Sequence, residues 1–474
     1  MTDRVSLRRA ERAYTDGAYA SAPVFVREDV PFMATGPVPG KRGRFAAFNF
    51  GPTVVFPAVT NACIGAAVRR RGLVRLPVPG RRAYWVVSDP EHVRRVLVTN
   101  AENYDKAGPL YGVIASAGGE GLFTVNDPAL WRTLRQLMGP AFQRSNMSTV
   151  AELSSRLWQR RMARFDPGRP VDFFDEFKQL GIETLVEYLF GETADTGRIA
   201  WLAQSVFEGL AGQLFLPGWM PGAARYARAM AAFDDLVYSM IRARRSSSVP
   251  RDDLLGYLVF AGDPQTGTGL TDRQVRDQVF TLFMAGFDST ATVLAWAVKY
   301  LARDPPSFGR LRAEVLGVVG SRPPTLADTA DLPRLRAFWQ TVLHYQPAFR
   351  IFFRNVVGAD RLGDAAVSPG DQLMISPYAT HRDPRYFPGA RHFDPDLLAH
   401  PLTARERSAH LPFGQGRRKC PGEEMAYATG VLPLAMLLQR CDALSLPSLH
   451  GGLRNRYAIT SPPLSSRVRV TLHG

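Results

Sequence analysis

The pattern of apolar and polar residues predicts a mainly helical protein with a minor β part. Two short apolar runs, Leu73–Pro77 and Ala83–Ser88, are separated by a turn rich in proline, glycine and arginine, and they predict a small hairpin. Most segments within Ala129–Arg245 carry helical periodicity. Strand-like runs return at Arg350–Val357 and Gln372–Ser376, so the β structure is expected toward the two ends of the chain.

The longest predicted helix lies in the middle of the sequence. It begins at Leu270–Asp272, runs through Tyr300, and ends at the prolines of Asp304–Pro306. Because Val279–Val298 is apolar on nearly all sides, this helix is expected to be buried at the centre of the molecule. A final helix is expected after Cys420, preceded by an irregular segment.

Composition and charge narrow the class of protein. With 474 residues, of which 46% are hydrophobic, the chain can bury a large core. No linker divides it, so we expect a flexible N-terminus at residues 1–23 and a single domain over residues 24–474. The formal net charge is +15, but the arginines are scattered along helices without interleaved aromatic residues, which argues against nucleic-acid binding.

The cysteines and the N-terminal region give no sign of export or membrane anchoring. Cys63, Cys420 and Cys441 are too few and too irregularly spaced for a disulfide framework or a zinc site. Charged residues in Arg8–Arg12 interrupt the apolar core that a signal peptide needs. The apolar stretch Phe45–Val68 contains prolines and asparagines, which do not suit a spanning helix. We therefore expect a cytoplasmic protein without a membrane anchor.

The segment Phe413–Gly422, which we call the Cys loop, combines residues suited to hold a metal through sulfur. Its cysteine, Cys420, precedes a proline at the expected start of a helix, where free N–H groups and the helix dipole favour the thiolate. Arg418 and Lys419 add positive charge beside it. Two upstream glycines allow a tight turn that approaches a flat ligand closely. A thiolate in this setting is a soft, electron-donating ligand for iron.

The Cys loop resembles the Phe-x-x-Gly-x-Arg-x-Cys-x-Gly motif of the cytochrome P450 family and matches each fixed position. The resemblance covers about residues 70–474 and implies the fold of that family, a triangular prism that holds haem b between a long central helix and the Cys loop. It implies that Cys420 is the proximal iron ligand, that Phe413 packs against the haem and that Arg418 binds a haem propionate. The motif positions expected to contact the cofactor are Phe413, Gly414, Arg418, Cys420 and Gly422.

The central helix contains Ala285–Thr290, in which small residues are followed by an acid and two hydroxyls. A buried carboxylate needs partners, and a hydroxyl can take over a backbone carbonyl and kink the helix. By the resemblance this is the oxygen-activation groove, where Ala285 and Gly286 lie beside the haem and Gly286 leaves room for dioxygen. Asp288, Ser289 and the adjacent Thr290 are the implied catalytic residues, with Asp288 and Ser289 passing protons. The alternative is a helix kink with a solvated acid.

Three further residues are implied to contact the cofactor. Trp131 and Arg135 match the Trp-x-x-x-Arg helix of the family, and a spacing of four places both on one helical face, where they can grip a propionate. Arg354 is a further candidate for a propionate contact; the alternative is an ordinary surface arginine on a strand.

One family motif is missing. Where a Glu-x-x-Arg helix is expected, this chain has Thr341 and His344, and the partner arginine expected after Phe393–Asp396 is Leu397. Loss of one member of a buried ion triad costs about 3–5 kcal/mol, whereas replacement of the whole set can be neutral. We therefore interpret the change as a rebuilt contact, with His344 as a packed histidine in place of a structural arginine.

The resemblance implies a monooxygenase that uses dioxygen and electrons from an external ferredoxin and ferredoxin reductase. The segments expected to line the pocket are largely apolar and indicate a bulky hydrophobic small molecule, oxidised in secondary metabolism such as antibiotic biosynthesis by a monomeric bacterial enzyme. Several of these residues have core packing as the alternative, and Arg350 could meet a carboxylate. The expected pocket residues are Phe283, Phe287, Phe349, Arg350 and Phe352.

Two other functions stay open from the sequence. Some homologues of this family have lost the haem ligand and act as helper proteins for a partner enzyme, and the missing ion triad is compatible with that. The other is redox-neutral chemistry at a haem-thiolate centre, such as isomerisation or dehydration. Haem uptake distinguishes an enzyme from a helper protein. Dependence of turnover on reductant and dioxygen distinguishes a monooxygenase from an enzyme with redox-neutral chemistry.

Overall fold

The computed structural model describes most of the chain after residue 71. The described residues are 72–76, 82–191, 195–215, 223–247, 253–262, 267, 269–390, 392–447 and 460–473. The predicted flexible N-terminus at residues 1–23, the apolar stretch Phe45–Val68 and Cys63 lie outside them.

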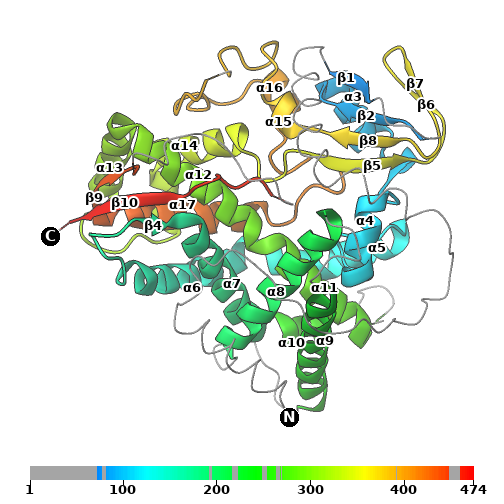
Figure 1. The fold of residues 1–474 in the computed structure, drawn as a ribbon, viewed down its shortest axis with the longest axis horizontal. Coiled ribbons are helices and arrows are strands. Elements are labelled where there is room, and N and C mark those ends of the chain that lie inside the picture. The colour runs from blue at the N-terminus through cyan, green and yellow to red at the C-terminus, as the bar shows by residue number, and fades with distance from the viewer. Residues whose placement is uncertain are drawn as a thin grey trace, which may run out of the picture.

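Helices form the bulk of the molecule, as the apolar pattern predicts, and the main sheet lies at one side of the helical body (Figure 1). The longer helices in chain order are α4 Pro109–Gly118, α5 Pro128–Met138, α6 Arg144–Met162, α7 Phe173–Phe190, α8 Thr196–Phe215, α9 Ala223–Ser246, α10 Leu254–Phe260, α11 Asp272–Gly286, α12 Asp288–Arg303, α13 Pro305–Val319, α14 Pro333–Tyr345 and α17 Glu423–Arg440. The short helices are α3 Pro90–Arg94, α15 Pro377–Thr380 and α16 Ala404–Ala409.

The strands form three small sheets. The largest has the order β1-β2-β8-β5-β3, in which β1 and β2 are the predicted hairpin and β2 runs parallel to β8, with Tyr84 opposite Gln372. A second sheet has the order β4-β10-β9, and β6 pairs with β7. The strands are β1 Leu73–Leu76, β2 Tyr84–Val87, β3 Tyr104–Asp105, β4 Val171–Asp172, β5 Phe352–Val356, β6 Asp360–Leu362, β7 Ala365–Val367, β8 Gln372–Ile375, β9 Cys441–Ser445 and β10 Arg467–Leu472.

The predicted central helix is present, but it is divided into α11 and α12 at Phe287. Thr271 caps its start through a capping box with Gln274, and Asp304 follows its end and caps α13. At the division the hydroxyl of Ser289 donates to the carbonyl oxygen of Ala285 at 2.8 Å, which is the hydroxyl substitution that the sequence predicts.

The α11–α12 stretch lies inside the protein. Among the described residues, Asp272–Arg303 is the one stretch long and apolar enough in composition to cross a membrane, and 72% of its most apolar window is buried by the rest of the chain. α12 packs against α7, α17 and α14, with Trp296 fully enclosed. The apolar character of this stretch therefore reflects its central position in the core.

α17, the helix that follows the Cys loop, runs without interruption from Glu423 to Arg440, although it contains Gly430 and Pro433, which are unfavourable in a helix interior. A side chain at Gly430 would overlap the indole ring of Trp339, so glycine allows α14 and α17 to approach closely. The carbonyl oxygen of Pro433 accepts a hydrogen bond from Nε1 of Trp158 at 3.1 Å. Both residues that are unfavourable in a helix thus have a packing role against buried tryptophans.

Candidate active site

Three backbone hydrogen bonds shape the Cys loop. The amide of Cys420 donates to the carbonyl oxygen of Phe413, and the amide of Lys419 donates to that of Gly416, each at 3.0 Å, while the amide of Gly414 donates to Leu411 at 3.1 Å. Two tight turns therefore bring Phe413 and Cys420, seven positions apart, next to each other before α17 begins. This is the turn that the glycine content of the segment predicts.

The two glycines of the loop are required by the backbone. Gly414 and Gly416 have φ angles of 71° and 73°, a region that L side chains rarely adopt. A side chain at Gly416 would also overlap the carbonyl oxygen of Leu97. Gly422, in contrast, has a negative φ angle, and a Cβ there would lie 3.9 Å from the sulfur of Cys420, so the loop is closely packed around the thiol.

The thiol of Cys420 combines solvent exposure with close surroundings. Its side chain is exposed to solvent, yet the surrounding protein removes enough water for burial to raise the pKa of the thiol. A hydrogen bond from the backbone of Gly422 and the charges of Arg135 and Lys419 lower the pKa, but their effect is smaller. The backbone amide and the basic neighbours thus favour the thiolate as expected, but burial outweighs them in the protein without iron; binding to a metal ion would remove the proton.

Three cations from distant segments gather at the Cys loop: the buried Lys106 and Arg354 and the half-buried Arg418, which we call the cation cluster. Their mutual repulsion and burial lower the pKa of Lys106 well below its usual value and that of Arg418 to about 10, with burial the larger cause in each. Within the described parts of the chain, the hydrogen bonds of the three go to carbonyl oxygens, those of Phe123, Phe353 and Val125 respectively, and to no carboxylate. Such a cluster calls for an anionic ligand.

The cation cluster contains two residues that we predicted to contact the cofactor, Arg354 and Arg418, and one that we did not predict, Lys106. Arg354 is buried on β5, and not on the surface as the alternative interpretation would have it. Arg418 lies over the ring of Trp131, 5.0 Å from its centroid, while Arg135 on the same helix lies near Cys420. Lys106 was missed by sequence reasoning because it stands in a short segment without a motif, and only its packing against Tyr111 and Phe123 reveals it.

On the central helix, the predicted groove residues occupy different faces. Ala285 is exposed and Ser289 half-buried in a stretch that is otherwise largely enclosed, and a spacing of four places them on one face. Gly286 instead faces α7, because a side chain there would lie 2.7 Å from Leu185. The glycine therefore accommodates helix packing, which is a different role from the dioxygen space that we expected.

Asp288 is buried and bound to a residue from the end of the chain. The hydroxyl of Thr460 donates to Oδ2 of Asp288 and accepts from the hydroxyl of Thr292 at 3.1 Å. Burial raises the pKa of Asp288, and the bond from Thr460 and the charge of Lys178 oppose that rise less strongly. The carboxyl of Asp288 is therefore enclosed and hydrogen-bonded. It stands at the end of a hydrogen-bonded series that begins at Thr292 and passes through Thr460.

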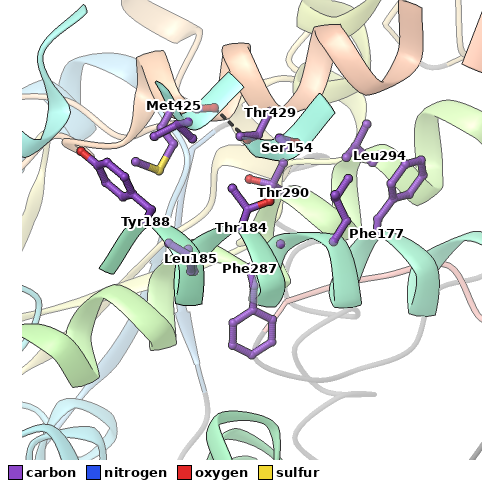
Figure 2. A pocket seen from close by; sticks show the side chains of 14 residues that line it. Ser154, Phe177, Thr184, Leu185, Tyr188, Phe287, Thr290, Leu294, Met425 and Thr429 are labelled. Carbon is purple, nitrogen blue, oxygen red and sulfur yellow. Dashed lines mark hydrogen bonds between the residues drawn. The ribbon is translucent and has the colours of Figure 1, made fainter. Parts of the chain in front are cut away.

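Thr290 faces a separate, small cavity of about 30 Å³ between α6, α7, α12 and α17 (Figure 2). Figure 2 shows its hydroxyl among those of Ser154 and Thr184, with Met425 and Thr429 of α17 on the far wall. It therefore does not share the accessible face of Ala285 and Ser289. The structure does not place Thr290 with the other two implied catalytic residues.

The predicted substrate residues divide into two groups. Phe283 and Phe287 are enclosed in the aromatic core, Phe283 stacked on Phe190 and Phe287 against Phe207 at 5.2 Å, so core packing explains them. Phe349 and Phe352 are half-buried; Phe352 is the first residue of β5, and Phe349 lies three positions before it. The guanidinium of Arg350 lies 4.2 Å from the ring centroid of Tyr378 and donates to Gln346 at 3.0 Å, and these contacts give it a structural role.

These features together fit a haem. The donor set is a single accessible thiol at the start of a helix, flanked by glycines that permit close approach. The cation cluster lies where two acidic groups of the ligand would be neutralised. Phe413 is half-buried beside Tyr427, with ring centroids 6.1 Å apart, and provides an aromatic surface next to the thiol.

Comparison with known proteins agrees with this geometry. The family model for cytochrome P450 matches residues 74–450. The chain is 33% identical to cyclooctatin synthase of Streptomyces melanosporofaciens over 397 residues, which are 81% of this chain and 86% of that protein. It is 31% identical to pentalenene oxygenase of Streptomyces avermitilis over 381 residues, 78% of this chain and 83% of the relative.

The solved haem domain of cytochrome P450DA superimposes with a TM-score of 0.77 at 25% identity, covering 88% of this chain and 93% of that domain. Relatives of comparable similarity are named as monooxygenases or oxygenases. The chain therefore belongs to the cytochrome P450 family, binds haem and is an oxidoreductase that incorporates oxygen.

Proposed function

We propose that this enzyme oxidises a bulky, apolar small molecule at the accessible face of Ala285 and Ser289. The observation that carries the proposal is the opening of the central helix there, where the Ser289 hydroxyl has replaced a backbone donor on the Ala285 carbonyl. Curated relatives are named for cyclooctatin, cyclooctat-9-en-7-ol and pentalenene. We infer that the substrate is a ring-containing, apolar molecule of this general kind, made in secondary metabolism.

Cys420 is the residue that would hold the haem iron, and the cation cluster would neutralise the haem propionates. The bound haem supplies the redox chemistry and the site at which dioxygen binds. The protein contributes a solvent-exposed thiol that follows the turns at Gly414 and Gly416. Phe349 and Phe352, half-buried and apolar, are the remaining candidates for substrate contact among those that the sequence singled out.

Asp288 is the group that we assign to proton handling. Its raised pKa allows the carboxyl to hold a proton closer to neutral pH than an exposed acid does. Thr460 keeps Oδ2 oriented, and the adjacent Ser289 lies on the accessible face. We infer that protons pass between Asp288 and Ser289, and that Thr290, in its separate cavity, takes no part.

Electrons are proposed to come from a separate ferredoxin and its reductase. Arg417 and Lys419 are exposed on the Cys loop and offer positive charge to an acidic partner, although Arg417 pairs with Glu102 and Lys419 with Glu423. Such rim pairs are weak and can exchange partners on docking. We further propose that the enzyme is cytoplasmic and monomeric.

The test begins with the reduced carbon monoxide difference spectrum of the purified protein. A thiolate-type Soret band that is lost in Cys420→Ala and kept in Cys441→Ala supports the assignment, because Cys441 is a buried thiol away from the Cys loop. Absence of haem uptake by the wild type contradicts it and favours a helper protein. Incorporation of label from ¹⁸O₂, dependent on ferredoxin and reductant, supports oxidation; turnover without either identifies redox-neutral chemistry.

A further inference from the structure

The end of α14 lacks the charged residues of the family motif, and buried uncharged contacts stand in their place. Thr341 and His344 are both fully enclosed. Oγ1 of Thr341 accepts a hydrogen bond from the backbone amide of Leu398 at 3.3 Å. The missing arginine, at the position of Leu397, would have linked this segment to α14. Here the link is a hydrogen bond between a hydroxyl and a backbone amide.

His344 belongs to a stack of three histidines, with His381 and His410. Its ring centroid lies 4.5 Å from that of His381 at an interplanar angle of 14°, and 5.5 Å from that of His410 at 15°. Nδ1 of His344 and Nδ1 of His410 are 3.3 Å apart, so one donates and the other accepts. The edge of Phe387 closes the stack at 4.3 Å from His344.

His381 connects α14 to the Cys loop through both of its ring nitrogens. Nδ1 lies 2.8 Å from the carbonyl oxygen of His344 and donates to it. Nε2 accepts from the backbone amide of Leu411 at 2.7 Å, and the carbonyl of Leu411 in turn accepts from Gly414. Two hydrogen bonds thus run from the last turn of α14 to the residue that precedes the Cys loop by two positions.

A metal ion is the obvious alternative occupant, since the three histidines lie close enough to share one. The geometry disfavours it. A metal lies in the plane of each ring that binds it, and nearly parallel stacked rings do not direct their lone pairs to a common point. His381 would also have to give up one of its two backbone hydrogen bonds, leaving either the buried amide of Leu411 or the buried carbonyl of His344 without that partner.

The surroundings of the stack favour neutral rings. Arg382 and Lys419 are the charged groups that act on it, and both are positive. Burial and these charges lower the pKa of all three histidines, that of His410 to about 4. A neutral hydrogen-bonded stack therefore replaces the buried ions, and it avoids the desolvation of charge that an ion triad requires.

We propose that His344, His381 and His410 form a histidine brace that positions the Cys loop and thereby the sulfur of Cys420. All three are positioning residues, because none touches the reacting atoms. The proposal rests on the assignment of Cys420 as iron ligand. It goes beyond that assignment by specifying how an enzyme without the ion triad keeps its thiolate ligand in place.

The amide of Leu411 offers a direct test, because Pro412 has no amide and the signal between His410 and Phe413 comes from Leu411 alone. Hydrogen–deuterium exchange is measured on the holoenzyme and on His381→Phe, which keeps a stacked ring and removes both hydrogen bonds. We expect the Leu411 amide to exchange about tenfold faster in the variant. His400→Phe, which alters an exposed histidine of the same segment, is the matched control and should leave the rate unchanged. Equal exchange in His381→Phe and wild type overturns the brace.

A second readout uses the ligand itself. In His381→Phe and His410→Leu, the thiolate-type band of the reduced carbon monoxide complex should convert to the thiol type about tenfold faster than in wild type. His410→Asn, whose amide can replace Nδ1, should recover most of this loss. A stable thiolate band in folded His381→Phe overturns the proposal. So does the finding that the wild type binds one equivalent of zinc or nickel and that His344→Asn does not. Failure of the wild type to bind haem contradicts the iron assignment instead; the Leu411 exchange is then compared between the wild-type and His381→Phe apoproteins, and it still tests the brace.

Discussion

The hydroxyl of Thr460 donates a hydrogen bond to Oδ2 of Asp288, so a residue near the C-terminus completes the polar site on the central helix. This bond opposes the rise in the pKa of Asp288 that burial causes. Thr292 donates to Thr460 from the next turn of α12, at 3.1 Å. A segment 172 positions away therefore contributes to the pKa of Asp288, in opposition to the larger effect of burial.

The first prediction concerns this bond. In Thr460→Val the carboxylate loses a donor, so the pKa of Asp288 should rise further, and the limb of the pH–rate profile that reports deprotonated Asp288 should move to higher pH. Thr292→Val, which leaves the Asp288 contact intact, should shift the limb less. Thr329→Val, a hydroxyl bound to the Leu326 carbonyl elsewhere, is the control. An identical profile for Thr460→Val and wild type would show that Asp288 does not govern the rate.

A second prediction separates haem binding from folding at Lys106. In Lys106→Met the apoprotein should be as stable as wild type or more stable, because a buried cation that repels Arg354 and Arg418 is removed. The holoprotein should lose haem to a scavenger at least about tenfold faster, since one propionate partner is absent. Stopped-flow haem transfer and thermal unfolding of both forms provide the measurements. Lys419→Met removes an exposed lysine paired with Glu423 and should change haem loss little.

The two glycines of the Cys loop form a matched pair for a third prediction. Gly414→Ala introduces strain at a φ angle of 71° but meets no atom within 4 Å, so it should cost about 1–2 kcal/mol. Gly416→Ala has the same strain and in addition overlaps the Leu97 carbonyl, so its loss of stability and of haem content should be clearly larger. Chemical unfolding and the haem-to-protein ratio distinguish them. Equal effects would mean that the Leu97 contact relaxes freely.

Gly430 gives a fourth prediction, in which packing and helix propensity oppose each other. By propensity, alanine in the middle of α17 would stabilise the helix by about 1 kcal/mol. The added methyl group would overlap the ring of Trp339, and overpacking of this kind costs about 1–3 kcal/mol, so Gly430→Ala should destabilise the protein. The combination with Trp339→Phe should be less destabilising than the two single changes added together. A stabilised Gly430→Ala would refute the close contact between α14 and α17.

The histidines predict a fifth effect, on stability at acid pH. The pKa of His410 is lowered to about 4, so between about pH 6.5 and pH 4 the unfolded chain binds more protons than the folded one. Stability should therefore fall as pH falls through this window, by up to about 3 kcal/mol for this residue alone. In His410→Asn the difference in unfolding free energy between pH 7 and pH 5 should shrink. An unchanged difference would show that His410 binds protons equally in the folded and unfolded chain.

The sequence alone determined the features in which neighbouring residues act together. The hairpin of β1 and β2, the caps at Asp89 and Thr271, and the turns of the Cys loop all depend on residues a few positions apart. Local backbone preferences are encoded at that range, and a contiguous motif carries its own geometry. Membership of the family was therefore predictable from the sequence.

Only the tertiary structure decided which distant side chains meet. Lys106 joins Arg354 and Arg418, and His381 joins His344, through contacts whose partners lie tens to hundreds of positions apart. The same packing assigned Phe287 to the core, because helical periodicity cannot tell a core face from a substrate face. Burial also reversed the expected direction of the Cys420 pKa, since the cost of removing water from a thiolate depends on all the surrounding atoms and not on the neighbouring charges in the sequence.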